Sequence, residues 1–192
     1  MKEMSIKVKN GMCKSSVFSH LKWYDYVIVI AVYIVLAILT IHHDVFHTVK
    51  SSYAILEGHL SDFYTYNQPI VGGNDYDVLV YLIFALWNLP MFLAGRATPW
   101  PATPAYIMLY QKILLVIFVL LAAWILYKIC TKIGANKKTA FYSSFLFMTA
   151  PYLLLSTVAY GMYDIMYVFF MLWGLCFFIK DEKKYNVYIS AL

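Results

Sequence analysis

The chain has 192 residues, of which 62% are hydrophobic and only 13% are charged. Soluble domains carry about 25% charged residues, because their surface must stay polar in water. The composition therefore excludes a soluble enzyme, a disordered segment, a collagen-like chain and a disulfide scaffold, and it indicates an integral membrane protein. The formal net charge of +5 adds little by itself, because the position of Lys and Arg sets orientation in a membrane.

A bilayer core needs roughly 20 helical residues, and the hydrophobic pattern divides the chain accordingly. The four expected transmembrane helices are at 23–41, 106–127, 140–160 and 165–179. The expected cytoplasmic parts are a basic tail at 1–22, a basic loop at 128–139 and a segment at 180–192 that leads into a further helix. The expected outer parts are a loop at 42–105, with interfacial helices at 44–58 and 78–93, and a turn at 161–164. The predicted fold class is all-α, with four transmembrane helices.

The lysines decide how the apolar segment at 78–93 is placed. Lysine clusters precede the first apolar segment, follow the one at 106–127 and follow the one at 165–179. If all five apolar segments crossed, two of these clusters would lie outside, against the positive-inside rule. With 78–93 in the outer interface, all three clusters and the N-terminus are cytoplasmic. A short tilted span is the alternative for 78–93, and the plasma membrane is the expected location.

Two carboxylates fall at the ends of predicted transmembrane helices, at the depth of the membrane interface. Asp44 follows the first of these helices, and Asp164 opens the fourth. Ionisable groups at this depth usually face a cavity or a partner. Helix capping is the structural alternative for both, because a carboxylate is stabilised by the free N–H groups of a helix N-terminus.

Asp44 also opens a stretch with helical periodicity. Apolar residues recur at spacings of three and four, and polar residues lie off that stripe. The stripe consists of Phe46, Val49, Tyr53 and Leu56, and the residues off it are His47, Lys50, Ser51 and Glu57. The pattern predicts an amphipathic interfacial helix that Gly58 is suited to end.

The histidines of the same loop raise the question of a metal. His42, His43, His47 and His59 lie near acids, which favours either a metal site or interfacial hydrogen bonding. A divalent cation held by Asp44, Asp164 and His43 is the candidate cofactor. The sequence contains no zinc-type Cys/His spacing, no phosphate-binding glycine loop and no Ser/His/Asp elbow.

The order of these features resembles the GT-C glycosyltransferases, membrane enzymes that take sugars from polyprenyl-phosphate donors. The resemblance runs from Trp23 to the C-terminus, through loose motifs. The segment from Asp44 to Gly58 matches the family's acid and amphipathic helix, without the second acid of the usual pair. Asp75-Tyr76-Asp77-Val78 stands where the family has a proline-containing element. Gly161-Met162-Tyr163-Asp164 matches the second acidic motif, with Met where Gln is common.

The resemblance implies sugar transfer to an acceptor hydroxyl at the outer face, with inversion. Asp44 would be the general base, and Asp164 would orient the acceptor, hold a metal or support Asp44. The implied partners are a polyprenyl-phosphate sugar donor, a lipid, glycan or protein acceptor, and membrane lipid, with no nucleic acid. Side chains expected to bind donor or acceptor are Asp62, His43, Lys50, Tyr64 and Arg96, and Lys112 is a further outer cation for the leaving phosphate. Because GT-C enzymes are far longer, the resemblance also implies an N-terminal portion.

Two other functions fit the composition. A non-catalytic scaffold or assembly factor would use both acids as helix caps. A transporter component usually has mid-membrane charge and internal repeats, and neither is evident here.

Overall fold

The structure is a computed structural model that describes residues 21–71, 78–95 and 105–179. Every regular element in those ranges is a helix, which confirms the all-α prediction for the described part of the chain. In chain order the helices are α1 (Trp23–Leu39), α2 (His43–Leu56), α3 (Phe63–Val71), α4 (Val78–Leu93), α5 (Ala105–Lys132), α6 (Lys137–Met148), the π-helix η2 (Leu153–Ala159) and α7 (Asp164–Phe178).

Helix α5 is the longest element, with 28 residues. At 1.5 Å per residue it extends about 42 Å, more than the hydrocarbon core of a bilayer. Within the described ranges it is the one helix that is long and apolar enough to cross a membrane by itself. The number rises to three if two bent pairs each count as one span: α1 with α2, bent by 81°, and α6 with η2, bent by 57°.

Apolar side chains on the outside of the bundle agree with a membrane environment. Much of α1 is uncovered, including Val27, Ile28 and Ile38, and so are Met171 and Phe178 on α7. Soluble proteins rarely leave an apolar surface of this extent in water. The lengths and the exposed surface together support a helical membrane protein.

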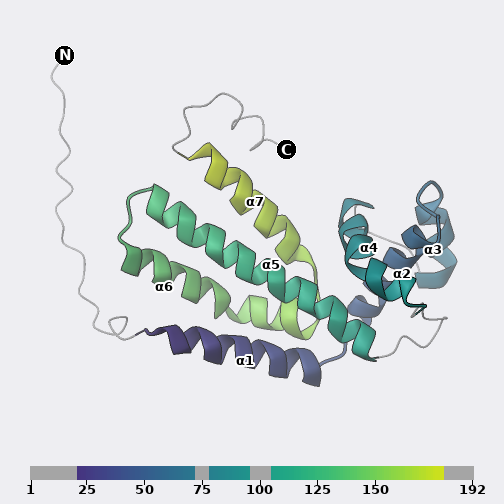
Figure 1. The fold of residues 1–192 in the computed structure, drawn as a ribbon, viewed down its shortest axis with the longest axis horizontal. Coiled ribbons are helices and arrows are strands. Elements are labelled where there is room, and N and C mark those ends of the chain that lie inside the picture. The colour runs from purple at the N-terminus through teal and green to yellow at the C-terminus, as the bar shows by residue number, and fades with distance from the viewer. Residues whose placement is uncertain (1–20, 72–77, 96–104, 180–192) are drawn as a thin grey trace, which may run out of the picture.

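Helix α5 packs between α6 and α7, and α1 runs alongside α6 (Figure 1). The hydroxyl of Ser144 on α6 donates to the carbonyl of Ala123 on α5 at 2.9 Å, which links these two helices. Two tyrosines attach α1 to α6, because the hydroxyls of Tyr26 and Tyr33 donate to backbone carbonyls of α6. The core of this bundle lies along the middle of α5.

The stretch expected as a single transmembrane helix at 140–160 is divided in two. Pro151 has no N–H to donate to the preceding turn, and α6 ends at Met148. The chain then continues as η2, where the N–H of Tyr160 donates to the carbonyl of Leu155, five residues back, at 2.9 Å. This break turns the end of η2 toward α1 and α5.

Helices α2, α3 and α4 form a second group beside one end of α5 (Figure 1). The sequence did not lead us to expect α3, which contains Pro69. The side of α2 expected to be polar and exposed is covered, since Lys50 and Ser51 are 8% and 0% exposed. The cover is largely α4, whose Asn88 amide nitrogen donates to the hydroxyl of Ser52 at 2.8 Å.

Candidate functional site

Asp44 lies in the first turn of α2, next to the residue that caps this helix. His42 is the N-cap, and its Nδ1 lies 3.4 Å from the backbone nitrogen of Asp44 and 3.3 Å from Asp44 Oδ2. The neutral ring can accept from the backbone N–H, whereas the protonated ring can pair with the carboxylate. The capping role thus belongs to His42, and the side chain of Asp44 is 42% exposed.

Asp164 is the first residue of α7, and its carboxylate accepts a hydrogen bond from the residue that precedes η2. The hydroxyl of Tyr152 donates to Asp164 Oδ2 at 3.4 Å. The N-cap of α7 is Tyr163, whose side chain makes no capping hydrogen bond. A carboxylate in this first turn is stabilised by the helix dipole, and its second oxygen remains an available acceptor.

The chain segments that carry the two acids touch each other. We call residues 40–45 the Asp44 turn and residues 159–164 the Asp164 turn. The rings of His42 and Tyr160 meet edge to face, with centroids 4.8 Å apart. Gly161 has a φ of +78°, and a Cβ there would lie 2.1 Å from Val45 Cγ2. Both the left-handed backbone and the close approach therefore require glycine at this position.

Lys112 of α5 connects the same two turns. Its side chain is 1% exposed, and its ammonium donates to the carbonyl and hydroxyl oxygens of Thr40 and to the carbonyl of Ala159, the last two at 3.0 and 2.9 Å. An ammonium has three N–H donors, so these three acceptors use all of them. This arrangement argues against Lys112 as a contact for a leaving phosphate.

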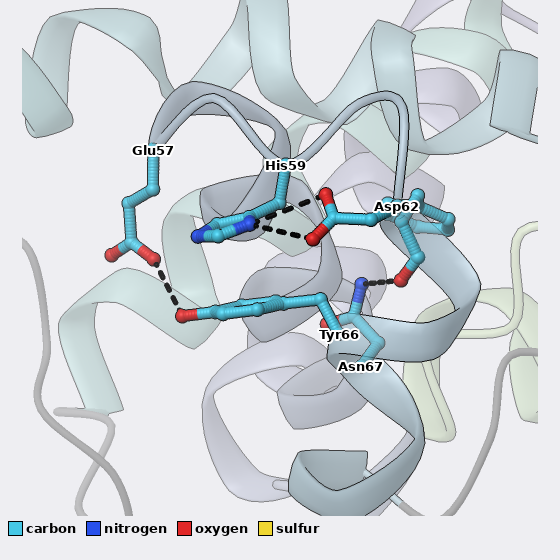
Figure 2. A network of polar contacts seen from close by, with 6 residues as sticks. Glu57, His59, Asp62, Tyr66 and Asn67 are labelled. Atoms are coloured by element: carbon cyan, nitrogen blue, oxygen red, sulfur yellow. Dashed lines mark hydrogen bonds and ion pairs between the residues drawn. The ribbon is translucent and has the colours of Figure 1, made fainter.

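A second polar cluster lies at the opposite end of α2 (Figure 2). His59 Nδ1 is 3.2 Å from Asp62 Oδ2, and the His59 ring stacks on that of Tyr66 with centroids 3.6 Å apart. The hydroxyl of Tyr66 donates to Glu57 Oε2 at 3.3 Å. Burial, followed by the negative charge of Glu57, raises the pKa of Tyr66 above its usual value.

Asp62, another predicted site residue, does not lie near Asp44. Asp44 and Glu57 are thirteen residues apart along helical backbone, a distance of about 20 Å. Asp62 therefore belongs to the cluster at the far end of α2, together with the exposed Tyr64. Arg96, Asp75 and Asp77 lie outside the described residues, as does the side chain of His43.

The metal hypothesis finds no support in the described part of the chain. No group of three or more His, Cys, Asp or Glu side chains there is arranged to hold a metal ion. The expected set of Asp44, Asp164 and His43 includes one side chain outside the described residues. The carboxylate of Asp44 contacts the ring of His42, and the carboxylate of Asp164 accepts a hydrogen bond from the hydroxyl of Tyr152.

Sequence reasoning missed Tyr152 and Tyr160 as parts of this region. Their positions depend on η2, because the wide π-helical turn sets where residues after Pro151 face. The only sequence signal was Pro151 inside an apolar stretch, which predicts a break but not the direction of the bend.

A scan of protein-family models finds no match, and searches among curated proteins and solved structures find no significant match either.

Proposed function

We propose that this chain is an integral membrane glycosyltransferase of the GT-C type, or the N-terminal portion of one. It would transfer a sugar from a polyprenyl-phosphate donor to an acceptor hydroxyl at the outer membrane face. The observation that carries the proposal is the contact between the Asp44 turn and the Asp164 turn. Two carboxylates distant in sequence thereby lie on neighbouring turns, and that of Asp44 is accessible to an acceptor.

The proposal includes four membrane crossings, by α1, α5, α6 with η2, and α7. The end of α1, the end of η2 and the first third of α5 meet at Lys112. Helices of alternating direction that meet in this way fit a bundle in which both turns lie at one membrane face. With the lysine clusters inside, that face is the outer one.

In the proposed reaction Asp44 takes the proton of the acceptor hydroxyl. The acceptor oxygen forms a bond to the anomeric carbon while the bond from that carbon to the phosphate oxygen breaks. Polyprenyl phosphate leaves with the electron pair, and attack from the opposite side inverts the anomeric configuration. Asp164, held by Tyr152, would orient the acceptor. For the leaving phosphate, Lys50 and Arg96 are the remaining candidates, because the ammonium of Lys112 already has three acceptors.

The test is Asp44→Asn in membranes that contain the whole chain. With a panel of polyprenyl-phosphate sugars (mannose, glucose and aminoarabinose), we expect the rate of transfer to fall at least about 100-fold, the usual size of a general-base contribution. Asp25→Asn is the matched control, because Asp25 lies at the other end of α1 from the Asp44 turn and accepts from the backbone N–H of Lys22. Transfer by Asp44→Asn at the rate of the control variant would remove Asp44 from the mechanism.

A further inference from the structure

Lys112 is a buried cation whose partners are helix ends. Thr40 follows α1 and Ala159 closes η2, so both carbonyls belong to the group that a helix leaves without an internal partner at its C-terminus. Such ends carry partial negative charge. Among the described residues Lys112 pairs with no carboxylate, and its ammonium donates to oxygens of Thr40 and Ala159.

We infer that Lys112 is a positioning residue, which holds the Asp44 turn against the Asp164 turn. The catalytic purpose of this contact rests on the proposed function, but the contact itself can be measured without any assay of catalysis. Three hydrogen bonds from one ammonium fix Thr40 and Ala159 relative to each other. Asp44 follows Thr40 by four residues, and Asp164 follows Ala159 by five, so the separation of the two acids depends on this lysine.

A neutral side chain of similar length would leave the two helix ends without their shared donor. Lys112→Met keeps most of the packing volume and removes the three hydrogen bonds, and the buried carbonyls then need other partners. The packing of Val45 against Gly161 would remain as a link between the turns, also in proteins where His42 and Tyr160 are replaced. We expect the turns to separate for a larger fraction of the time.

Cross-linking measures that separation. Cysteines replace His42 and Tyr160 in a chain whose own cysteines, Cys13, Cys130 and Cys176, are changed to serine. A short bismaleimide should link the pair efficiently in the otherwise native chain, because the two rings are in contact. Lys112→Met should lower the rate of cross-linking about tenfold, and Lys112→Arg should restore part of it because the charge and donors remain.

Lys132 offers a matched control in the same helix. Its ammonium donates to the carbonyl of Cys176 at 2.6 Å, twenty residues from Lys112 and about 30 Å along α5. Lys132→Met therefore removes a similar bond at the other end of the bundle and should leave the cross-linking rate unchanged. Equal rates in Lys112→Met and Lys132→Met would overturn the inference.

A milder substitution tests the inference in case Lys112→Met does not fold. Thr40→Val removes the hydroxyl, which accepts from Lys112 and donates to the carbonyl of Leu36, and it keeps the backbone carbonyl that accepts from Lys112. If Lys112→Met cannot be recovered from membranes, Thr40→Val should lower the cross-linking rate about twofold. An unchanged rate in that variant would count against the inference.

Catalysis provides a second readout that a purely structural role would not produce. Lys112→Met should lower kcat about tenfold while KM for the lipid-linked donor stays near the native value, because Asp44 is displaced from the acceptor and donor binding is kept. Lys132→Met should change neither constant. If the native chain transfers no sugar from any donor of the panel, the proposed function fails, and the cross-linking result still decides the role of Lys112.

Discussion

Gln111 and Lys112 are neighbours in α5, and both side chains are 1% exposed. The ammonium of Lys112 has three acceptors, whereas neither amide atom of Gln111 has a hydrogen-bond partner among the described residues. A buried amide without partners costs about 1–3 kcal/mol relative to its hydrated state. The two adjacent polar residues therefore differ in hydrogen bonding, since the donors of Lys112 are all used and the amide of Gln111 is unsatisfied.

Gln111→Leu should accordingly stabilise the protein by about 1–3 kcal/mol, because it removes an unpaired buried amide and keeps a similar volume. Thermal unfolding in detergent is the measurement, and the variant's Tm should rise. The exposed Gln68 gives the control, since Gln68→Leu should leave Tm nearly unchanged. A lower Tm for Gln111→Leu would mean that the amide is hydrogen-bonded in the folded protein.

At the residue scale the sequence placed Asp44 and Asp164 correctly at the starts of helices. That much follows from local pattern, because both acids stand at the edge of an apolar segment. The role of Lys112 could not be predicted, because its partners lie 72 and 47 residues away along the chain. From its position in the sequence alone, Lys112 was expected to be an outer cation that could contact the leaving phosphate.

At the scale of elements, Tyr66 of α3 should give the contact between α3 and the end of α2 a pH dependence. Tyr66 stacks on His59 and donates to Glu57, whose charge adds to burial in raising the pKa of Tyr66. A pKa raised by folding stabilises the folded state below the unfolded value of about 10. This contribution is lost as the pH rises through the folded pKa of Tyr66.

The titration of Tyr66 can be followed by NMR in a protein whose tyrosines carry ¹³C at Cζ. The Tyr66 signal is assigned by its loss in Tyr66→Phe. We expect Tyr66 to titrate above pH 10 in the native chain. Glu57→Gln removes the nearby negative charge and should bring the titration of Tyr66 back toward the usual range. Identical titration curves in the two proteins would show that Glu57 does not act on Tyr66.

Elements of strong hydrophobic pattern were the easiest to predict. The expected bounds of 78–93 coincide with α4, and those of 23–41 differ from α1 only at the end. Helix α3 escaped notice because it is short and contains Pro69. The prediction of one helix at 140–160 was wrong, because the chain divides into α6 and η2 around Pro151, and the π-helical form of η2 depends on packing against α1 and α5.

At the scale of the whole molecule the open question is which side of the membrane each end of the bundle faces. The proposed orientation puts the α2–α3 connection outside and the α5–α6 connection inside. Ser61 and Lys137 are exposed residues in or beside these two connections. In the chain without its own cysteines, each can carry a single new cysteine for labelling.

Ser61→Cys should react with a membrane-impermeant maleimide in intact cells. Lys137→Cys should react with the same reagent only after the cells are permeabilised, because the positive-inside rule places the lysines around it in the cytoplasm. Labelling of both cysteines from the same side would contradict the crossing by α5 that separates them. The reverse pattern would place both acid-bearing turns at the inner face.

The sequence by itself determined that the described chain is helical, that it holds at least one apolar segment long enough to cross a membrane, where most of its helices begin and end, and that two acids lie beside apolar segments. These are local properties, because hydrophobicity and helical periodicity depend only on neighbouring residues. Only the tertiary structure decided that α4 covers α2 and that the Asp44 turn meets the Asp164 turn. The physical reason is that both contacts depend on how helices pack, through a bend at Pro151 and a buried ammonium whose acceptors come from distant parts of the chain.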